Sequence, residues 1–583
     1  MAELSILSSL LHGTRGLELA YATVQAPMAL ALYRGRARVR QLLASPIIAA
    51  PLTIASGVIC TLFGPEAPVA SLFFGAAVSA GLGYLAGTVL TRPQRPDTAH
   101  QRGTMIVDGR RGGSRSVTRP DGPSIGGHAV PSQDETKHFK IIGTTGTGKS
   151  TAIAGLIAPA LARHDRLVIA DPDGGYLRRY YDASRGDVIL NPFDARSVRW
   201  DMFAEIRQPY DAEQLARALL PDPESGDATW CGYGRTLLTA LIRQSHGAGM
   251  RDVGELFRLI SMAPVAELRA LVNGTPAQPF LEEHNVRMFD SIRSVASSSI
   301  ASLEHIALQG GRDFSIRNWI SARAVPEGGS AGGQILFIPY RADQIAALRT
   351  TVSAWMRLAI FETMAGEEGD RRLWFVVDEL DALGKIDGLK DALARMRKFG
   401  GRCVLGFQSV AQVASTYGAG DAHTLVENCG TTLILRCSAS EGGGTARFAS
   451  SLIGQREVLR ATYARSRRAD ELLGSVTRSE HHSIEPAVLD SEIEQLPDLA
   501  GYLKFASAAR WQAVDLRSSL ELPGKRACAP AFVPAPAPVR PARRPAASAG
   551  RRRPSVARSK SRTASSRSAT QIAHPDNRPG AEP

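Results

Sequence analysis

The sequence predicts a protein of the α/β class, with a mostly parallel β-sheet, an inserted all-alpha domain and an N-terminal hairpin of two transmembrane helices. Three observations support this fold class. A glycine-rich loop follows a short apolar strand near residue 143, strand patterns give way to helical periodicity between residues 203 and 309, and two apolar stretches without internal charge lie between residues 42 and 90. A chain of 583 residues is long enough for several domains.

Residues 1–41 are predicted to form a cytoplasmic N-terminal segment, because they carry scattered charges and no signal-peptide pattern. Residues 42–91 are predicted to form the transmembrane hairpin, with helices at 42–63 and 67–90 that can each cross a hydrocarbon core of about 30 Å. Glu66 is the one charge between Gln41 and Thr91, and arginines flank the hairpin on both sides. The positive-inside rule therefore places both termini in the cytoplasm. Core helices of a soluble protein are the alternative, although these seldom run past about 20 residues without a charge.

Small residues recur every four positions from Gly75 to Gly87 in the second apolar stretch. Such a stripe lets membrane helices approach closely, either within the hairpin or between subunits. Two prolines in the first stretch, Pro46 and Pro51, are expected to kink or shorten that helix.

Residues 92–131 are polar and rich in glycine and arginine, which predicts a linker with short strands. The α/β domain is then expected in two parts, residues 132–202 and 310–522. Apolar runs predict its parallel strands at 139–142, 167–170, 187–190, 334–338, 373–377 and 402–407. Residues 203–309 form the predicted all-alpha domain, with helices over 211–220, 229–244, 253–272 and 279–306.

The loop over residues 143–151 reads GTTGTGKST and matches the P-loop pattern G-x-x-x-x-G-K-[ST] directly after a strand. Backbone N–H groups of such a loop and the N-terminus of the following helix bind the phosphates of ATP. Lys149 is expected to reach the β- and γ-phosphates, and the Ser150 hydroxyl to ligate Mg²⁺. A surface loop that ends in Lys-Ser by chance is the alternative. The predicted nucleotide contacts are Gly143, Thr144, Thr145, Gly146, Thr147, Gly148, Lys149, Ser150 and Thr151.

The apolar run 373–377 ends in Asp378 and Glu379, which is a Walker B pattern. Ligands bind at the carboxyl ends of parallel strands, so Asp378 is expected to hold Mg²⁺ with Ser150, and Glu379 to orient or deprotonate the attacking water. An apolar run followed by two acids is weak evidence by itself, since strands often leave a core at acidic residues. Together with the upstream P-loop it predicts a RecA-like nucleotide-binding domain that hydrolyses ATP.

Gln408 follows the strand at 402–407 and is expected to contact a water bound at the γ-phosphate. An ordinary polar residue at a strand end is the alternative. Arg395 and Arg397, on the helix predicted from Gly388 to Phe399, are candidates for an arginine finger that reaches the next subunit's nucleotide. A solvated basic helix end is the competing explanation.

The formal net charge is +13, but residues 525–583 hold 13 Lys and Arg against 2 Asp and Glu, so +11 of it lies in this tail. Residues 523–583 are rich in Pro, Ala, Arg and Ser and are predicted to be disordered. The basic blocks fit DNA phosphate binding without sequence choice, with recruitment of a protein partner as the alternative. The six cysteines form no C-x-x-C pair, so neither a disulfide framework nor a zinc site is predicted.

Several phrases together resemble the type IV coupling proteins of the TraD and TrwB group, which are hexameric membrane ATPases of conjugation and type IV secretion. These phrases are the P-loop, DPDGG at 171–175, ILNPFD at 189–194, WCGYGR at 230–235, the acids at 378–379 and QS at 408–409. The resemblance covers residues 42–516, including the paired membrane helices and the helical insertion. The short outside turn and the basic tail depart from the family pattern.

The resemblance implies an ATP-driven motor in the bacterial inner membrane, a homo-hexamer that links relaxase-bound single-stranded DNA to type IV secretion channel components. It implies ATP and Mg²⁺ as cofactors, and Lys149, Glu379, Arg397 and Gln408 as catalytic residues, with Arg397 acting on the neighbouring subunit. Three other functions stay open: an FtsK-like translocase on duplex DNA, a coupling protein for protein effectors, and a membrane tether that uses nucleotide for assembly. An ABC transporter or a small GTPase does not fit, because neither an LSGGQ nor an NKxD sequence is present.

Overall fold

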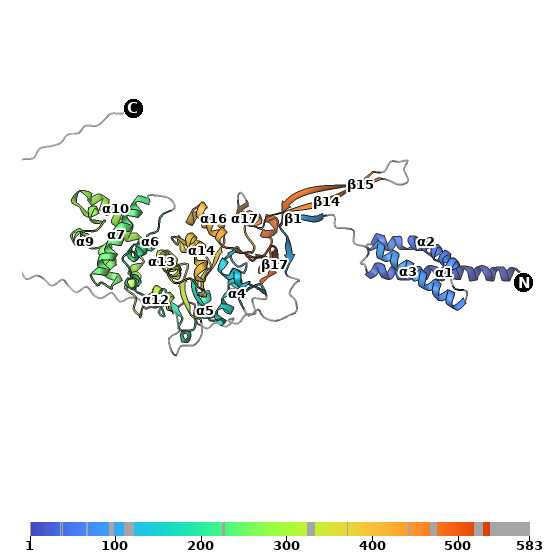
Figure 1. Ribbon diagram of the computed structural model, residues 1–583, viewed down its shortest axis with the longest axis horizontal. Helices are drawn as coiled ribbons and strands as arrows, with labels where there is room; N and C mark the ends of the chain where they lie inside the picture. Colours follow the sequence, from blue (N-terminus) through green and yellow to red (C-terminus); the bar gives the residue numbers. More distant parts are fainter. Residues whose placement is uncertain are drawn as a thin grey trace, which may run out of the picture. The chain divides into compact units, whose positions relative to one another are not determined.

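The structure is a computed structural model. It describes residues 2–34, 37, 39–63, 65, 68–91, 98–109, 122–223, 228–322, 333–369, 371–440, 443–466, 475–517 and 529–536. Its elements are shown along the chain in Figure 1.

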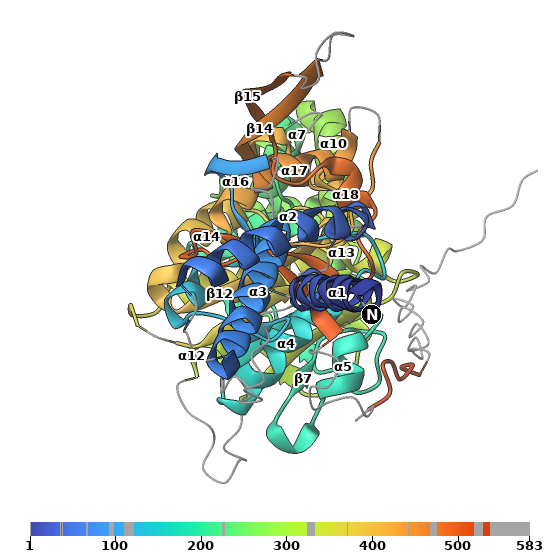
Figure 2. The ribbon, with the colours of Figure 1, turned by 90° about the vertical axis from the view of Figure 1, so that its right-hand side faces the viewer.

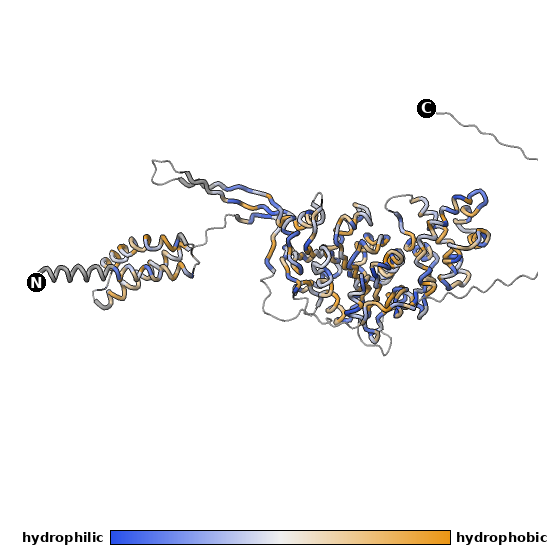
Figure 3. The backbone as a smooth tube through the Cα atoms, turned by 180° about the vertical axis from the view of Figure 1, so that it is seen from behind, coloured by the Kyte–Doolittle hydropathy of each residue, from blue (hydrophilic) through white to orange (hydrophobic). Residues whose placement is uncertain are grey.

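Two of the N-terminal helices, α2 (Val39–Phe63) and α3 (Pro68–Leu90), contain stretches long and apolar enough to cross a membrane, at Gln41–Phe63 and Ala70–Leu90. Hydrophobic segments run through both (Figure 3). They coincide with the two predicted spans. Pro46 and Pro51 lie inside α2, which continues past both prolines, so the expected shortening of this helix is not observed.

A third helix, α1 (Ala2–Arg34), packs against the hairpin and was not expected as part of it. Its residues Val24 and Met28 are buried, and a Cβ atom added at Gly83 of α3 would collide with the carbonyl group of Val24. Gly87 approaches Met28 in the same way. The small residues at 83 and 87 therefore serve the contact between α1 and α3. The cytoplasmic placement of residues 1–41 stays a prediction.

The main sheet has ten strands in the order β2-β17-β16-β13-β5-β12-β11-β6-β10-β7. From β13 to β7 every neighbouring pair is parallel, whereas β16 and β17 run antiparallel, so the mostly parallel sheet is confirmed. Its strands are β2 (Ile106–Asp108), β5 (Phe139–Ile142), β6 (Arg166–Pro172), β7 (Val188–Ile189), β10 (Ile335–Tyr340), β11 (Leu373–Val377), β12 (Gly401–Phe407), β13 (Thr431–Ile434), β16 (Ala500–Lys504) and β17 (Trp511–Asp515).

Strands of the predicted linker are built into the body of the protein. Strand β2 pairs with β17 at the edge of the main sheet, and β1 (Thr98–Gly103) pairs with β14 (Gln455–Ser466). Strand β14 in turn forms a long antiparallel hairpin with β15 (Ser475–Pro486), visible in Figure 2. A small β3–β4 hairpin (Ser124–Ile125 and His128–Ala129) completes this region.

The region predicted as the all-alpha domain is helical, and its helices form one group in Figure 1. The helix predicted over 253–272 is divided, because Pro264 lacks an N–H and restricts the residue before it. The helix predicted over 279–306 divides as well. The observed helices are α6 (Asp211–Leu219), α7 (Ala228–Gly247), α8 (Val253–Ser261), α9 (Val265–Val272), α10 (Val286–Ser299) and α11 (Leu303–Ala307), with short 3-10 turns at Gln278–Leu281 and Glu283–Asn285.

A buried carboxylate joins the two ends of this insertion. Short parallel strands β8 (Arg199–Trp200) and β9 (Asp313–Phe314) bring the entering and leaving chains together. Between them Glu205 accepts hydrogen bonds from the Trp200 indole (3.0 Å), from Ser315 Oγ (3.1 Å) and from two backbone N–H groups at the start of α12 (Ile316–Ser321; 2.7 and 3.0 Å). We call this arrangement the Glu205 clasp.

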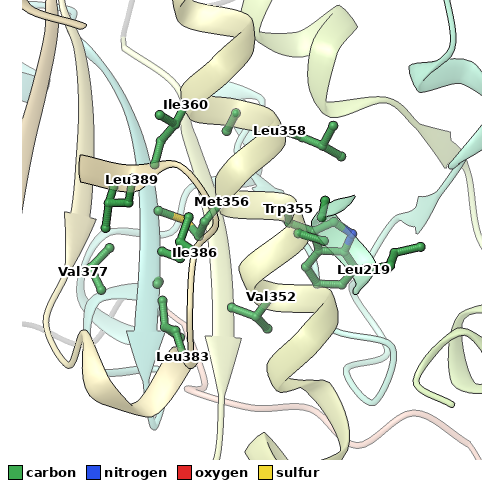
Figure 4. Close-up of a cluster of buried hydrophobic side chains, with 14 of the residues drawn as sticks. Leu219, Val352, Trp355, Met356, Leu358, Ile360, Val377, Leu383, Ile386 and Leu389 are labelled. Atoms are coloured by element: carbon green, nitrogen blue, oxygen red, sulfur yellow. The ribbon is translucent and has the colours of Figure 1, made fainter. Parts of the chain in front are cut away.

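Helix α13 (Ile345–Met364) lies between the sheet and the helical domain and is buried along most of its length. Figure 4 shows its side chains Val352, Trp355 and Met356 in one cluster with Leu219 of α6 and Val377 of β11. The cluster makes a continuous apolar core of the two domains, so movement of one is resisted by packing against the other. A second core fills the opposite face of the sheet around α4 (Lys149–Ala162) and β5.

The prediction that residues 523–583 are disordered throughout is wrong for residues 529–536. This segment makes backbone hydrogen bonds to Arg178, Phe193 and Ala195 of the α/β domain. Its composition gives it no core of its own, but its backbone N–H and C=O groups find partners on a surface that the rest of the chain has already formed. The remainder of the predicted tail, at 523–528 and 537–583, lies outside the described residues.

Candidate nucleotide site

The P-loop joins β5 to α4 and takes the shape that binds phosphate in such loops. Gly146 and Gly148 have φ angles of +79° and +114°, which side-chain-bearing residues rarely adopt. Gly148 stands at the N-terminus of α4, a 14-residue helix whose first turn presents unpaired N–H groups and the positive end of the helix dipole. The side chain of Thr147 turns inward and donates to Thr144 O (2.7 Å), which fixes the loop.

Lys149 is buried at the N-terminus of α4. Its Nζ donates to the carbonyl oxygens of Gly143 (2.8 Å) and Thr144 (3.2 Å). These two predicted nucleotide contacts therefore hold the lysine side chain against the loop. Burial lowers the pKa of Lys149, and the nearby acids Asp378 and Glu379 oppose that shift. An anion in the loop would offer the ammonium group a stronger partner than two neutral carbonyls.

Asp378 and Ser150 form the pair expected at a metal site. Ser150 Oγ donates to Asp378 Oδ2 (2.7 Å), and Tyr176 Oη donates to the same oxygen (2.8 Å). The other carboxylate oxygen, Oδ1, is buried without a hydrogen-bond partner among the described residues. A buried carboxylate oxygen with free acceptor capacity next to a hydroxyl is the donor set that Mg²⁺ prefers, so the residues present fit this ion.

Glu379 and Gln408 are held together beside the loop. Gln408 Nε2 donates to Glu379 Oε1 (2.7 Å), and Gln408 Oε1 accepts from Thr145 Oγ1 (2.9 Å). Burial raises the pKa of Glu379, with further upward effects from Asp378 and Asp381, while the Gln408 hydrogen bond opposes the shift. A carboxylate with a raised pKa is a better general base.

Three strand ends form the site. The P-loop strand β5 neighbours β12, which ends at Gln408, and β12 neighbours β11, which ends at the two acids. The P-loop and the acids therefore follow strands that are separated by one strand, β12. Strand β12 places Gln408 between the P-loop and the acids, and the hydrogen bond from Ser150 Oγ to Asp378 Oδ2 connects the P-loop helix to the end of β11.

These groups surround one cavity of about 360 Å³. Its lining residues are Thr145, Gly146, Gly148, Lys149, Ser150, Thr151, Pro172, Asp173, Gly175, Tyr176, Arg179, Asp378 and Glu379. Arg397 is not among them. Arg397 begins a short turn that follows α14 (Leu389–Met396). Burial and, to a smaller extent, the charge of Arg397 lower the pKa of the His138 imidazole to about 4, although a hydrogen bond to Leu393 O opposes this shift.

Sequence reasoning missed the functional residues at the end of β6 and at the start of α5. Asp171 is fully buried and accepts from the backbone N–H groups of Tyr176 (3.1 Å) and Leu177 (2.7 Å), at the start of α5 (Gly175–Tyr180). Burial raises the pKa of Asp171 to about 7, although these backbone donors oppose the shift. The phrase DPDGG, followed by a tyrosine, was the available signal, and the structure gives it a local role: it aims Tyr176 at Asp378.

The chain is similar to known proteins. Residues 123–517 match the family model of the type IV secretion-system coupling protein DNA-binding domain. The chain is 34% identical over 415 residues to coupling protein TraD of Escherichia coli K12, a match that spans 70% of this chain and 56% of TraD. It is 27% identical over 173 residues to the conjugal transfer protein TraG of Escherichia coli, which covers 28% of this chain and 27% of TraG.

Solved structures agree as well. The conjugative coupling protein TrwBΔN70 in its unbound form has a TM-score of 0.65 and 31% identity, covering 75% of this chain and 97% of that one. TrwB in complex with ADP and Mg²⁺ has a TM-score of 0.64 and 31% identity, covering 75% and 98%. The family model that matches residues 123–517, together with the similarity to TrwB, shows that this chain belongs to the type IV secretion-system coupling proteins.

Proposed function

We propose that this chain is an ATP-driven motor of the bacterial inner membrane that links relaxase-bound single-stranded DNA to a type IV secretion channel. The observation that carries the proposal is the convergence of Lys149, Ser150, Asp378 and Glu379 on one cavity, with Gln408 bonded to its edge. TrwB, a relative of similar fold, has been solved with ADP and Mg²⁺.

ATP and Mg²⁺ are the cofactors that this cavity fits. The P-loop N–H groups and Lys149 would bind the phosphates, and Ser150 and Asp378 would hold the ion, which neutralises charge on the phosphate oxygens. Tyr176 fixes the rotamer of Asp378 by its hydrogen bond. Glu379 accepts a proton from the attacking water, and Gln408 keeps the Glu379 carboxylate oriented for this.

The assembly that we propose is a homo-hexamer around a central channel. Arg397 lies away from the cavity of its own chain, which is where a residue that completes a neighbour's site must lie. In a ring, such an arginine would make hydrolysis depend on subunit contact. The basic residues of the tail would bind DNA phosphates, with a strong dependence on salt.

The membrane arrangement follows from the apolar helices and the arginines around them. The hairpin α2–α3 would cross the inner membrane with its turn outside and its arginine-rich flanks in the cytoplasm. Both termini would then be cytoplasmic. The contacts of Gly83 with Val24 and of Gly87 with Met28 make α1 run parallel to α3, from the turn side of the hairpin towards its arginine-rich side, so the N-terminus is the stricter test of this topology. A reporter fused before residue 2 should respond as cytoplasmic, and an external response would contradict this placement of the N-terminus.

The function is tested by phosphate release from the full-length protein in detergent, with and without single-stranded DNA. The wild type should hydrolyse ATP faster with DNA, and Lys149→Ala should insert in the membrane and lose hydrolysis. Stimulation by duplex DNA alone would favour an FtsK-like translocase, and a protein without hydrolysis would favour a nucleotide-dependent tether. Co-purification of effectors in place of relaxase would make proteins the cargo.

A further inference from the structure

The C-terminal segment at residues 529–536 contacts both of the phrases DPDGG and ILNPFD, which mark the family in the sequence, through Gly174 of the first and Phe193 and Asp194 of the second. The loop from Phe193 to Arg196 is rigid, because Asn191 Oδ1 accepts from Phe193 N (2.8 Å) and Asn191 Nδ2 donates to Pro339 O (3.0 Å). Asp194 binds the Arg196 guanidinium through both carboxylate oxygens (2.9 and 2.7 Å).

Residues 529–536, with the sequence APAFVPAP, lie against this loop. Ala195 N donates to Val533 O (2.8 Å), Val533 N donates to Asp194 Oδ2 (3.2 Å), and Ala535 N donates to Phe193 O (2.8 Å). We call the surface of Gly174, Arg178, residues 193–196 and Arg341 the tail groove.

The segment also contacts the turn after β6. Ala529 N donates to Arg178 O (3.3 Å), and Arg196 Nη1 donates to Pro530 O (2.9 Å). Gly174 has a φ of +67°, and a Cβ atom there would come within 2.5 Å of Ala531 O. The Arg341 guanidinium lies 5.2 Å from the centre of the Phe532 ring, at a distance typical of a cation–π contact.

The sequence of the segment suits this groove. Pro530, Pro534 and Pro536 are exposed and have no N–H, whereas Ala529, Val533 and Ala535 use theirs to bind the groove. Prolines also restrict the free segment to extended conformations, which reduces the entropy lost on docking. Backbone pairing by an extended chain with prolines at the unpaired positions is a peptide-recognition mode.

The tail groove and the nucleotide cavity are both formed in part by the β6–α5 turn and the first residues of α5. Gly174 and Arg178 stand on either side of Tyr176, and Tyr176 donates to Asp378. Asp173, Gly175, Tyr176 and Arg179 line the nucleotide cavity itself. A segment that holds this turn from outside therefore also holds the residue that positions the predicted metal ligand.

We propose that residues 529–536 are a docking segment that binds the tail groove of its own chain and stabilises the β6–α5 turn, so that docking and nucleotide binding support each other. The proposal rests on the nucleotide site proposed above. Coupling between two sites is reciprocal, so a change that releases the segment weakens nucleotide binding by the same factor that nucleotide strengthens docking.

The test uses full-length protein in detergent and two matched substitutions in the segment. Ala535→Pro removes the N–H that binds Phe193 O, and Pro536→Ala changes an exposed neighbour that makes no hydrogen bond to the described residues. Hydrogen exchange at the amides of Ala195, Ala529 and Val533, which are present in both variants, measures docking. Titration with a non-hydrolysable ATP analogue measures nucleotide affinity.

We expect slow exchange of these amides in the wild type and in Pro536→Ala, and fast exchange in Ala535→Pro. The analogue should bind Ala535→Pro about five- to tenfold more weakly, and Pro536→Ala within twofold of the wild type. Lys149→Ala separates the two proposals, because it should lose the analogue but keep the protected segment. If Lys149→Ala still binds the analogue, the nucleotide-site assignment fails while the docking result stands.

Three results would overturn the inference. Unprotected amides in the wild type would show that the segment does not dock. Equal affinities of Ala535→Pro and Pro536→Ala for the analogue would show that docking and nucleotide binding are independent. Protection that disappears when the protein is diluted to monomers would place the segment in a neighbouring subunit's groove.

Discussion

Replacement of Gln408 by alanine tests the chemistry at the centre of the site. Gln408 Nε2 donates to Glu379 Oε1 at 2.7 Å, and this hydrogen bond favours the ionised form of the carboxylate against burial and the nearby acids. Gln408→Ala removes the donor, so the pKa of Glu379 rises further. Because the base must be ionised to accept a proton, the acidic limb of the hydrolysis rate should move to higher pH.

The size of the shift follows from the geometry. A hydrogen bond to a charged group contributes about 1.5–3 kcal/mol, and one pKa unit corresponds to about 1.4 kcal/mol, so complete loss would raise the pKa by about 1–2 units. Glu379 is half-buried, and water replaces part of the lost interaction. We therefore expect the midpoint of the acidic limb to rise by about 0.5–1 unit at a fixed, saturating Mg²⁺ concentration.

The assay is the rate of phosphate release between pH 5 and pH 9, with wild-type protein and with Gln412→Ala as the control. Gln412 is an exposed glutamine on α15 (Val410–Tyr417), one turn beyond the site. Its substitution should leave the midpoint unchanged. An unmoved acidic limb in Gln408→Ala, or a shift to lower pH, would refute the role of the Gln408–Glu379 hydrogen bond.

The remaining predictions concern the domain junction, the membrane hairpin and the tail. Glu205→Gln replaces one acceptor oxygen of the Glu205 clasp by a donor and should lower the free energy of unfolding by about 2–4 kcal/mol. The control is Glu213→Gln at an exposed position of α6, which should change the free energy of unfolding by less than about 0.5 kcal/mol. Equal thermal unfolding curves for these two variants would contradict the clasp. A reporter inserted at Pro65 should lie outside, and one inserted after Thr91 should lie in the cytoplasm; the same side for both would contradict the hairpin. Deletion of residues 537–583 keeps the docked segment and should weaken binding to single-stranded DNA and reduce its salt dependence, and an unchanged salt slope would assign the tail another role.

Much of the fold could be predicted from local patterns. The strands β5, β11 and β12 are short apolar runs followed by polar residues, and a parallel sheet brings such strand ends together. Lys149, Asp378 and Glu379 could therefore be predicted to lie in one site from the sequence alone. These residues are far apart along the chain, but the parallel sheet brings the ends of their strands close together.

The features that could not be predicted depend on contacts between distant parts of the chain. Tyr176 was missed because nothing local shows that its hydroxyl reaches an acid 202 residues away. The β14–β15 hairpin was missed because its strands are rich in polar and charged residues and show no apolar alternation. Segment 529–536 looks disordered by composition, and its order comes entirely from the groove on which it lies.

The most direct measurement of the central claim is a single-turnover experiment on Glu379→Gln in full-length protein. The amide keeps the size of the side chain but cannot accept a proton from water. The account predicts that ATP binds within about threefold of the wild-type affinity, while the rate of the chemical step falls by about 10² to 10⁴. Hydrolysis at the wild-type rate would contradict the claim that this cavity is the site of ATP hydrolysis.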